Sequence, residues 1–500
     1  MNKEDWKSYG LIILILSLVK LTIQCIGNRN YGFHRDELLH LSVGEHLDWG
    51  YMEFPPFIGW LGRLSDLWFN YSLSGTRLFP TIAGVGILVL TCMMVKEMKG
   101  GRAGVFLAGM CILGMASFYR NHTLFQPVAF DQLFWTLGFY FFIRFINREH
   151  KNDLIWMGIS LGFGLLNKYT MLVWGFGAFI GILSFRRAAL FKNRWLYLSG
   201  LISLLIFLPN IIWQASHDFP LFKHLARLRE TQLDQISGFQ FVLDQLESPF
   251  TFIMIVLGVV GTFALSQQKK YIPISVAAIV MFSTMWILKS KTYYIYALYP
   301  VLFGLGARMI EIIFQKRTWV PYVIAVGMVL PVIPFIPHMT PVLSIEKYLE
   351  FAEIDAEGGR YIMTGDYADM HGWEEQVALI DSIYRSLDAE EKSSCVLWAE
   401  NYGEAGALKV LGEKYNLPDP ICRHGSFWTW GPGNASAEVW ISLGNEEGAI
   451  DYAFHEKELV KIIKHPYAID EEHNIPVYLC RRPKVDITDW WASYEPYIFQ

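Results

Sequence analysis

Two neighbouring carboxylates, Asp36 and Glu37, lie near the beginning of the sequence, within residues 31–38. A carboxylate can act as a general base that accepts the proton of an attacking hydroxyl. An acidic pair at the start of a helix also interacts favourably with the helix dipole, and then needs no chemical role. This motif alone favours the structural interpretation, so a catalytic role depends on the residues that accompany it.

A third carboxylate, Asp131, follows Pro127 at the beginning of an apolar stretch. Proline suits the first turn of a helix, so Asp131 is expected just inside a membrane segment. Ionisable residues at membrane depth are functional candidates by default. A structural ion pair with Arg120 is the alternative, and the sequence leaves both interpretations open.

Three lysines, Lys168, Lys289 and Lys291, lie in short polar breaks between apolar stretches. The charge pattern described below predicts that these breaks face outward, where lysine is unexpected. An anionic lipid phosphate would attract positive charge to this side. The alternative is that a lysine merely extends its side chain toward ordinary lipid head groups.

The elements that must position these residues are membrane helices. Of the 500 residues, 53% are hydrophobic and 18% are charged, and the apolar residues occur in blocks near the length that a bilayer requires. We interpret the first block, residues 9–27, as a span and not as a cleaved signal peptide. With the later blocks, about eleven spans are predicted: 77–95, 103–119, 128–146, 154–167, 169–185, 195–213, 250–266, 272–288, 293–310 and 319–337.

The positions of basic residues predict the orientation of these spans. Clusters of lysine and arginine follow every second block: Lys96, Lys99 and Arg102; Arg144, Arg148 and Lys151; Arg186, Arg187, Lys192 and Arg194; Lys269 and Lys270; Lys316 and Arg317. All of them are cytoplasmic if the N-terminus is cytoplasmic, as the positive-inside rule requires. An odd number of spans then places the C-terminal region outside the cytoplasm. The formal net charge of -5 suggests no nucleic-acid partner.

The composition changes after residue 338, where charged residues become frequent. We therefore expect a membrane domain over 1–338, with long outer loops at 28–76 and 214–249, and an extracytoplasmic α/β domain over 339–500. Strands are predicted at 360–364, 395–399, 438–443 and 477–480, and helices at 373–387, 404–414 and 446–456. No CxxC or HExxH spacing occurs, so no structural zinc site is predicted.

Glycosyl transfer from a lipid phosphate would need the residue types found here: carboxylates on the outer side, an intramembrane aspartate and outer lysines. A carboxylate would accept the proton of the acceptor, and cations would stabilise the leaving phosphate. A transporter or flippase of lipid-linked sugars would also explain the lysines and Asp131, but no internal repeat supports it. A binding or sensor protein, in which the soluble domain acts alone, is a further alternative.

Several motifs resemble glycosyltransferase family 39, whose members have the GT-C fold and use polyprenyl-phosphate sugars. The first-loop signature of that family resembles Arg35-Asp36-Glu37 with Trp49-Gly50-Tyr51 and Pro55-Pro56. Further resemblances are Phe130-Asp131, Leu166-Asn167-Lys168-Tyr169, Lys291-Thr292-Tyr293-Tyr294 and Leu298-Tyr299-Pro300. A bacterial subgroup resembles the soluble domain at 368–373, 401–407 and 428–433. Asn167 stands where the family more often has threonine.

The resemblance implies an inverting glycosyltransferase of the cell membrane. Asp36 would be the catalytic base, with Glu37 orienting it or the acceptor. Asp131, Lys168, Lys291, Tyr293 and Tyr294 would bind the donor, a polyprenyl-phosphate sugar. The acceptor would be an unknown hydroxyl-bearing lipid, glycan or protein of the cell envelope. No cofactor is predicted, and a divalent-cation requirement stays open.

Overall fold

The computed structural model describes residues 3–185, 192–247, 249–434 and 436–493. Arg186 and Arg187 of the third basic cluster lie outside these residues. The chain divides into two compact units. The first contains residues 1–28, 54–57 and 77–342, and the second contains 29–53, 58–76 and 343–500. The loop that follows the first helix therefore belongs to the same compact unit as the C-terminal region. The predicted boundaries instead counted this loop, 28–76, with the membrane domain 1–338.

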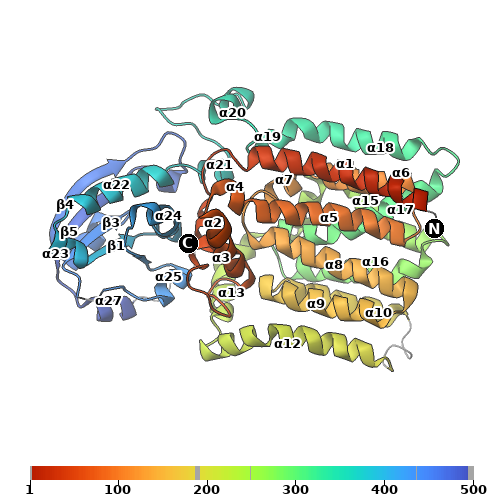
Figure 1. Ribbon diagram of the computed structural model, residues 1–500, viewed down its shortest axis with the longest axis horizontal. Coiled ribbons are helices and arrows are strands. Elements are labelled where there is room, and N and C mark those ends of the chain that lie inside the picture. Colours follow the sequence, from red (N-terminus) through yellow and green to blue (C-terminus); the bar gives the residue numbers. More distant parts are fainter. Residues whose placement is uncertain (1–2, 186–191, 248, 435, 494–500) are drawn as a thin grey trace. The chain divides into compact units, whose positions relative to one another are not determined.

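The first unit is helical in the residues described, because its long apolar blocks satisfy their backbone groups within helices. Its long helices run side by side (Figure 1). In chain order its elements are α1 (Lys3–Gly27), α5 (Leu78–Glu97), α6 (Arg102–Leu113), α7 (Ser117–Asn121), α8 (Pro127–Arg148), α9 (Lys151–Asn167), α10 (Met171–Phe185), α12 (Arg194–Ser216), α13 (Pro220–Thr231), η1 (Leu233–Gln235), α14 (Gly238–Leu243), η2 (Asp244–Glu247), α15 (Pro249–Ala264), η3 (Lys269–Tyr271), α16 (Ile272–Ile287), η4 (Thr292–Leu298), α17 (Tyr299–Ile313), α18 (Val320–Val329), η5 (Leu330–Phe335) and α19 (Ile336–Met339).

Among the residues described, six helices are long and apolar enough to cross a membrane. A bent pair over Gly238–Leu246 and Phe250–Ala264 would make seven. The protein is thus a multi-pass membrane protein, as predicted. The count of eleven spans stays a prediction, because these six or seven candidates are fewer, even with the shorter apolar helices Arg102–Leu113 and Met171–Ser184. The six are Tyr9–Gly27, Leu73–Glu97, Arg194–Ser216, Lys269–Ile287, Thr292–Ile313 and Val320–Met339.

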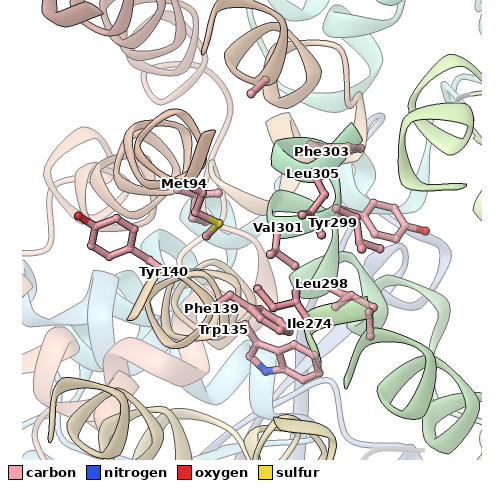
Figure 2. Packing of buried hydrophobic residues seen from close by; sticks show 14 of the residues in the cluster. Met94, Trp135, Phe139, Tyr140, Ile274, Leu298, Tyr299, Val301, Phe303 and Leu305 are labelled. Atoms are coloured by element: carbon pink, nitrogen blue, oxygen red, sulfur yellow. The ribbon is translucent and has the colours of Figure 1, made fainter. Parts of the chain in front are cut away.

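Large side chains from several helices fill the core of the first unit. Trp135 and Phe139 of α8 lie close to Leu298 and Val301, at the junction of η4 and α17 (Figure 2). Close packing of this kind tolerates little movement of one element against another. The core therefore holds η4 firmly against α8.

The second unit contains a five-stranded sheet in the order β2-β1-β3-β5-β4. β1 is parallel to β2 and β3, whereas β5 is antiparallel to β3 and β4. The elements are α2 (Arg35–Ser42), α3 (Phe57–Phe69, with its first residue in the first unit), α4 (Leu73–Thr76), α20 (Ile345–Phe351), α21 (Gly365–Ala368), α22 (Trp373–Ser386), α23 (Ala389–Ser393), β1 (Cys395–Ala399), α24 (Tyr402–Gly412), η6 (Glu413–Tyr415), β2 (Pro420–Cys422), α25 (Gly425–Thr429), β3 (Val439–Leu443), α26 (Glu447–Ala453), β4 (Phe454–Ile463), η7 (Asp470–Glu472), β5 (Ile475–Pro483) and α27 (Ile487–Ser493).

Most predicted elements of this region are confirmed, and two predictions are wrong. Residues 360–364 form no strand, since Arg360 makes only an isolated bridge with Glu357. The backbone N–H of Tyr361 donates to the carbonyl of Pro466 instead of entering a ladder. The helix predicted over 446–456 ends at Ala453, because the following residues pair with β5 as β4.

Candidate functional site

In the first unit, the side chains predicted to bind the donor gather where α8, α9 and η4 meet. Asp131 lies in the second turn of α8 and is buried. Lys168 follows the last residue of α9, and Asn167 donates its side-chain amide to the carbonyl of Pro127 at 2.9 Å. This hydrogen bond fixes the end of α9 beside the start of α8. Lys168 is thereby placed near Asp131.

Aromatic rings surround the ammonium of Lys168. Its Nζ lies 3.6 Å from the ring centre of Tyr294 and 5.4 Å from that of Tyr293. The two rings meet edge to face, with their centres 4.7 Å apart. A cation over the face of a tyrosine is stabilised by the negative charge of the π system. Lys168 also interacts electrostatically with Asp131 and with Lys291, so the five predicted donor residues form one group.

Thr170 completes this group, although no role was predicted for it. Its hydroxyl donates to the carboxylate of Asp131, lying 2.9 Å from each of the two oxygens. Tyr169, between Thr170 and Lys168, donates to Asn210 and accepts from Gln214. The turn between α9 and α10 is therefore anchored to α12 as well as to α8. The only sequence signal for Thr170 was its position two residues after Lys168.

Lys289 stands apart from this group. Its side chain is 43% exposed, and its Nζ lies 3.9 Å from Asp234. It also donates to the backbone carbonyl of Asp234. A lysine that is exposed and paired in this way fits the alternative interpretation, in which the side chain only extends toward solvent or head groups.

The two first-loop carboxylates lie in the second unit, at the start of α2. His34 caps this helix: its Nδ1 accepts from the backbone N–H of Asp36 at 3.1 Å. The carboxylate of Glu37 accepts from the backbone N–H of His34 at 2.9 Å and completes a capping box. Glu37 is thus buried and engaged, whereas the side chain of Asp36 is 39% exposed. Of the two, Asp36 is the carboxylate that a solvent-borne hydroxyl can reach.

Within the second unit, residues of the C-terminal region contact both Asp36 and its neighbour Arg35. The hydroxyl of Tyr402 donates to Asp36 Oδ1 at 3.0 Å. Arg35 donates to Asp369 and to Glu471, at 2.7 Å in each case. Neither Tyr402 nor Asp369 was predicted as a site residue, although both lie in segments that resemble a bacterial subgroup, 401–407 and 368–373.

Asp369 links the two residues that precede Asp36. Its second oxygen lies 3.1 Å from His34 Nε2. Burial raises the pKa of Asp369, and electrostatic interactions with His34 and Arg35 oppose that rise. Burial alone would lower the pKa of His34, but Asp369 and the other nearby carboxylates raise it above its usual value. This arrangement holds the N-terminal turn of α2 in place on the C-terminal region.

Two helices of the second unit meet at a glycine, which brings Tyr402 and Asp36 together. A Cβ at Gly406 of α24 would lie 2.8 Å from Leu38 Cβ and 2.9 Å from the Leu38 carbonyl carbon. Backbone atoms cannot move aside as a flexible side chain can. Only glycine allows α24 to approach α2 this closely.

We therefore predict that Gly406→Ala forces the two helices apart. The purified protein should lose about 1 to 3 kcal/mol of unfolding free energy, the usual cost of overpacking. Gly448→Ala is the matched control, because a Cβ there meets nothing within 4 Å and alanine favours a helix. Thermal unfolding of both variants checks the prediction. A Gly406→Ala protein that melts like the Gly448→Ala control would contradict it.

The apolar helices define a multi-pass membrane protein. Among these helices lies a polar cluster that contains Lys168, Asp131 and the two tyrosines of η4. Residues 53–213 match the family model described as dolichyl-phosphate-mannose-protein mannosyltransferase. Over 94% of this chain and 98% of the other, the fold is similar to that of ArnT from Cupriavidus metallidurans bound to undecaprenyl phosphate, with a TM-score of 0.61 and 13% identity. The chain has the GT-C fold, and the resemblance drawn from its motifs is confirmed.

The chain is also similar to a further solved structure and to two curated proteins. The oligosaccharyltransferase of Archaeoglobus fulgidus is similar over 86% of this chain and 67% of its own, with a TM-score of 0.53 and 12% identity. The lipopolysaccharide core galacturonosyltransferase RgtA of Rhizobium johnstonii is 24% identical over 219 residues, or 41% of this chain and 42% of that protein. RgtB of the same organism is 27% identical over 183 residues, or 36% of each chain. The matches thus span about two fifths of these curated relatives.

Proposed function

We propose that this protein is a glycosyltransferase that moves a sugar from a polyprenyl-phosphate donor to a hydroxyl of a cell-envelope acceptor. The observation that carries this proposal is the GT-C fold across 94% of the chain, shared with an ArnT structure that contains undecaprenyl phosphate. The two curated relatives named above are lipopolysaccharide core galacturonosyltransferases, which also supports a sugar transferase. The reaction would take place on the outer side of the membrane.

The proposed reaction proceeds with inversion. The acceptor oxygen attacks the anomeric carbon of the sugar and forms the new glycosidic bond. The bond between that carbon and the phosphate oxygen breaks, and the lipid phosphate leaves. Asp36 accepts the proton of the acceptor hydroxyl. Lys168 and Lys291 stabilise the negative charge on the phosphate, and Asp131 with Tyr293 and Tyr294 shapes the place for the sugar.

The test compares cells that carry the gene with cells that lack it. We expect mass analysis of the envelope lipids, glycans and proteins to show one component that lacks a sugar when the gene is deleted. The unused polyprenyl-phosphate sugar should accumulate. Reintroducing the parent gene should restore the sugar, whereas a gene encoding Asp36→Asn should not.

The same experiment separates this proposal from a transporter of lipid-linked sugars. A transporter has no need of a general base, so Asp36→Asn would then restore the envelope as well as the parent does. An envelope with the same composition in the presence and absence of the gene would contradict the proposed function.

A further inference from the structure

A hydrogen bond joins Asp36, the exposed carboxylate of the first loop, to the C-terminal region. The hydroxyl of Tyr402 lies 3.0 Å from Asp36 Oδ1 and donates to it. Burial, and next the negative charge of Asp36, raise the pKa of Tyr402 well above its ordinary value. The phenol therefore keeps its proton and remains a donor at neutral pH.

The position of Tyr402 is fixed by the start of α24. Asn401 caps this helix by accepting from the backbone N–H groups of Gly403 at 2.8 Å and Glu404 at 3.0 Å. The side-chain amide of Asn401 donates to Glu472 at 2.9 Å. These bonds leave the first turn of α24 little freedom to rotate. The backbone of Tyr402 is thus fixed, and the centre of its ring lies 6.3 Å from that of the His424 ring.

The position of Asp36 is fixed by different contacts. His34 and Glu37 cap α2, and the close approach at Gly406 sets the distance between α2 and α24. Asp36 Oδ2 lies 4.0 Å from His34 Nδ1. The Tyr402 hydroxyl therefore engages one oxygen of Asp36 and fixes the direction of the other. A general base depends on such alignment with the proton that it accepts.

We propose that Tyr402 is a positioning residue that orients Asp36 for proton transfer, so that the C-terminal region forms part of the catalytic machinery. This inference rests on the proposed function. It adds a catalytic role for the C-terminal region, where the alternative is a purely structural cap. Tyr402 acts through Asp36 and does not itself exchange a proton with the substrate.

The test is a double-mutant cycle on the full-length protein in lipid nanodiscs, with sugar transfer from a polyprenyl-phosphate sugar as the readout. Tyr402→Phe keeps the ring and removes only the hydroxyl. We expect kcat to fall by about 10-fold or more, the usual effect of losing a hydrogen bond to a charged group. The KM for the donor should stay unchanged. In the Asp36→Asn background, Tyr402→Phe should cause no further loss.

Tyr415→Phe is the matched control, since Tyr415 lies in the same unit in η6 and contacts Arg385 and Lys414. It should transfer sugar at the parent rate. An unchanged rate in Tyr402→Phe would overturn the proposal. An equal loss in the presence and absence of the Asp36 carboxylate would overturn it too, because a purely structural role predicts that result. Absence of transfer by the parent itself would contradict the proposed function, and this role with it.

Discussion

Replacing Asp36 with asparagine is expected to lower the rate of sugar transfer by roughly 100-fold or more, the usual contribution of a positioned general base. Asparagine has nearly the same shape and can still accept the hydrogen bond from Tyr402. It cannot accept the proton of the acceptor hydroxyl. The variant should therefore fold, insert into the membrane and bind the donor like the parent. Transfer by the purified protein, measured beside donor binding, checks this result.

Two further variants make this test specific. Glu37→Gln should lose less activity, because the amide oxygen of glutamine can still accept the backbone N–H of His34 that Glu37 accepts now. Asp419→Asn removes an exposed carboxylate of the same unit, whose partner is Lys409, and it should retain full activity. If Asp36→Asn transferred sugar at near the parent rate, Asp36 would not be the base and Asp131 would become the leading candidate.

Replacing Lys168 with methionine is expected to weaken binding of the donor by roughly 10- to 100-fold, the range for a lost hydrogen bond to a charged group. Methionine is similar in length and can still pack against the rings of Tyr293 and Tyr294. It supplies no charge to the phosphate. Lys168→Arg should lose less, because the charge is kept. Binding of a polyprenyl phosphate to the purified variants measures the effect.

Lys289→Met is the control for this prediction. It removes the same charge from an exposed lysine that interacts with Asp234, so donor binding should hardly change. Equal donor affinity in Lys168→Met and the parent would mean that Lys168 serves only to balance the charge of Asp131. Equal losses in the two methionine variants would point to a general effect of positive charge on this side of the protein.

Much of the fold follows from local patterns in the sequence. Long apolar blocks predicted the membrane helices, because a helix is the simplest way to satisfy a backbone in lipid. Runs of β-branched and aromatic residues predicted β1, β3 and β5 in the C-terminal region. β4 was missed because the residues between its two buried ends are exposed on both faces of the strand. The consecutive charges of Glu456, Lys457 and Glu458 do not form the alternating pattern of a half-buried strand.

Local sequence patterns predicted the kinds of secondary structure and the polar residues of the candidate site: Asp36, Glu37, Asp131, Lys168, Lys291, Tyr293 and Tyr294. The packing of distant segments sets which of these side chains are exposed and which residues contact them. It buried Glu37 in a capping box, set the rings of η4 around Lys168, and brought Tyr402 to Asp36 across 366 positions of the chain. Periodicity reports only on neighbours within a few residues. A contact between two helices that are distant in the sequence depends on how closely their surfaces fit. Here α2 and α24 fit closely because Gly406 has no Cβ.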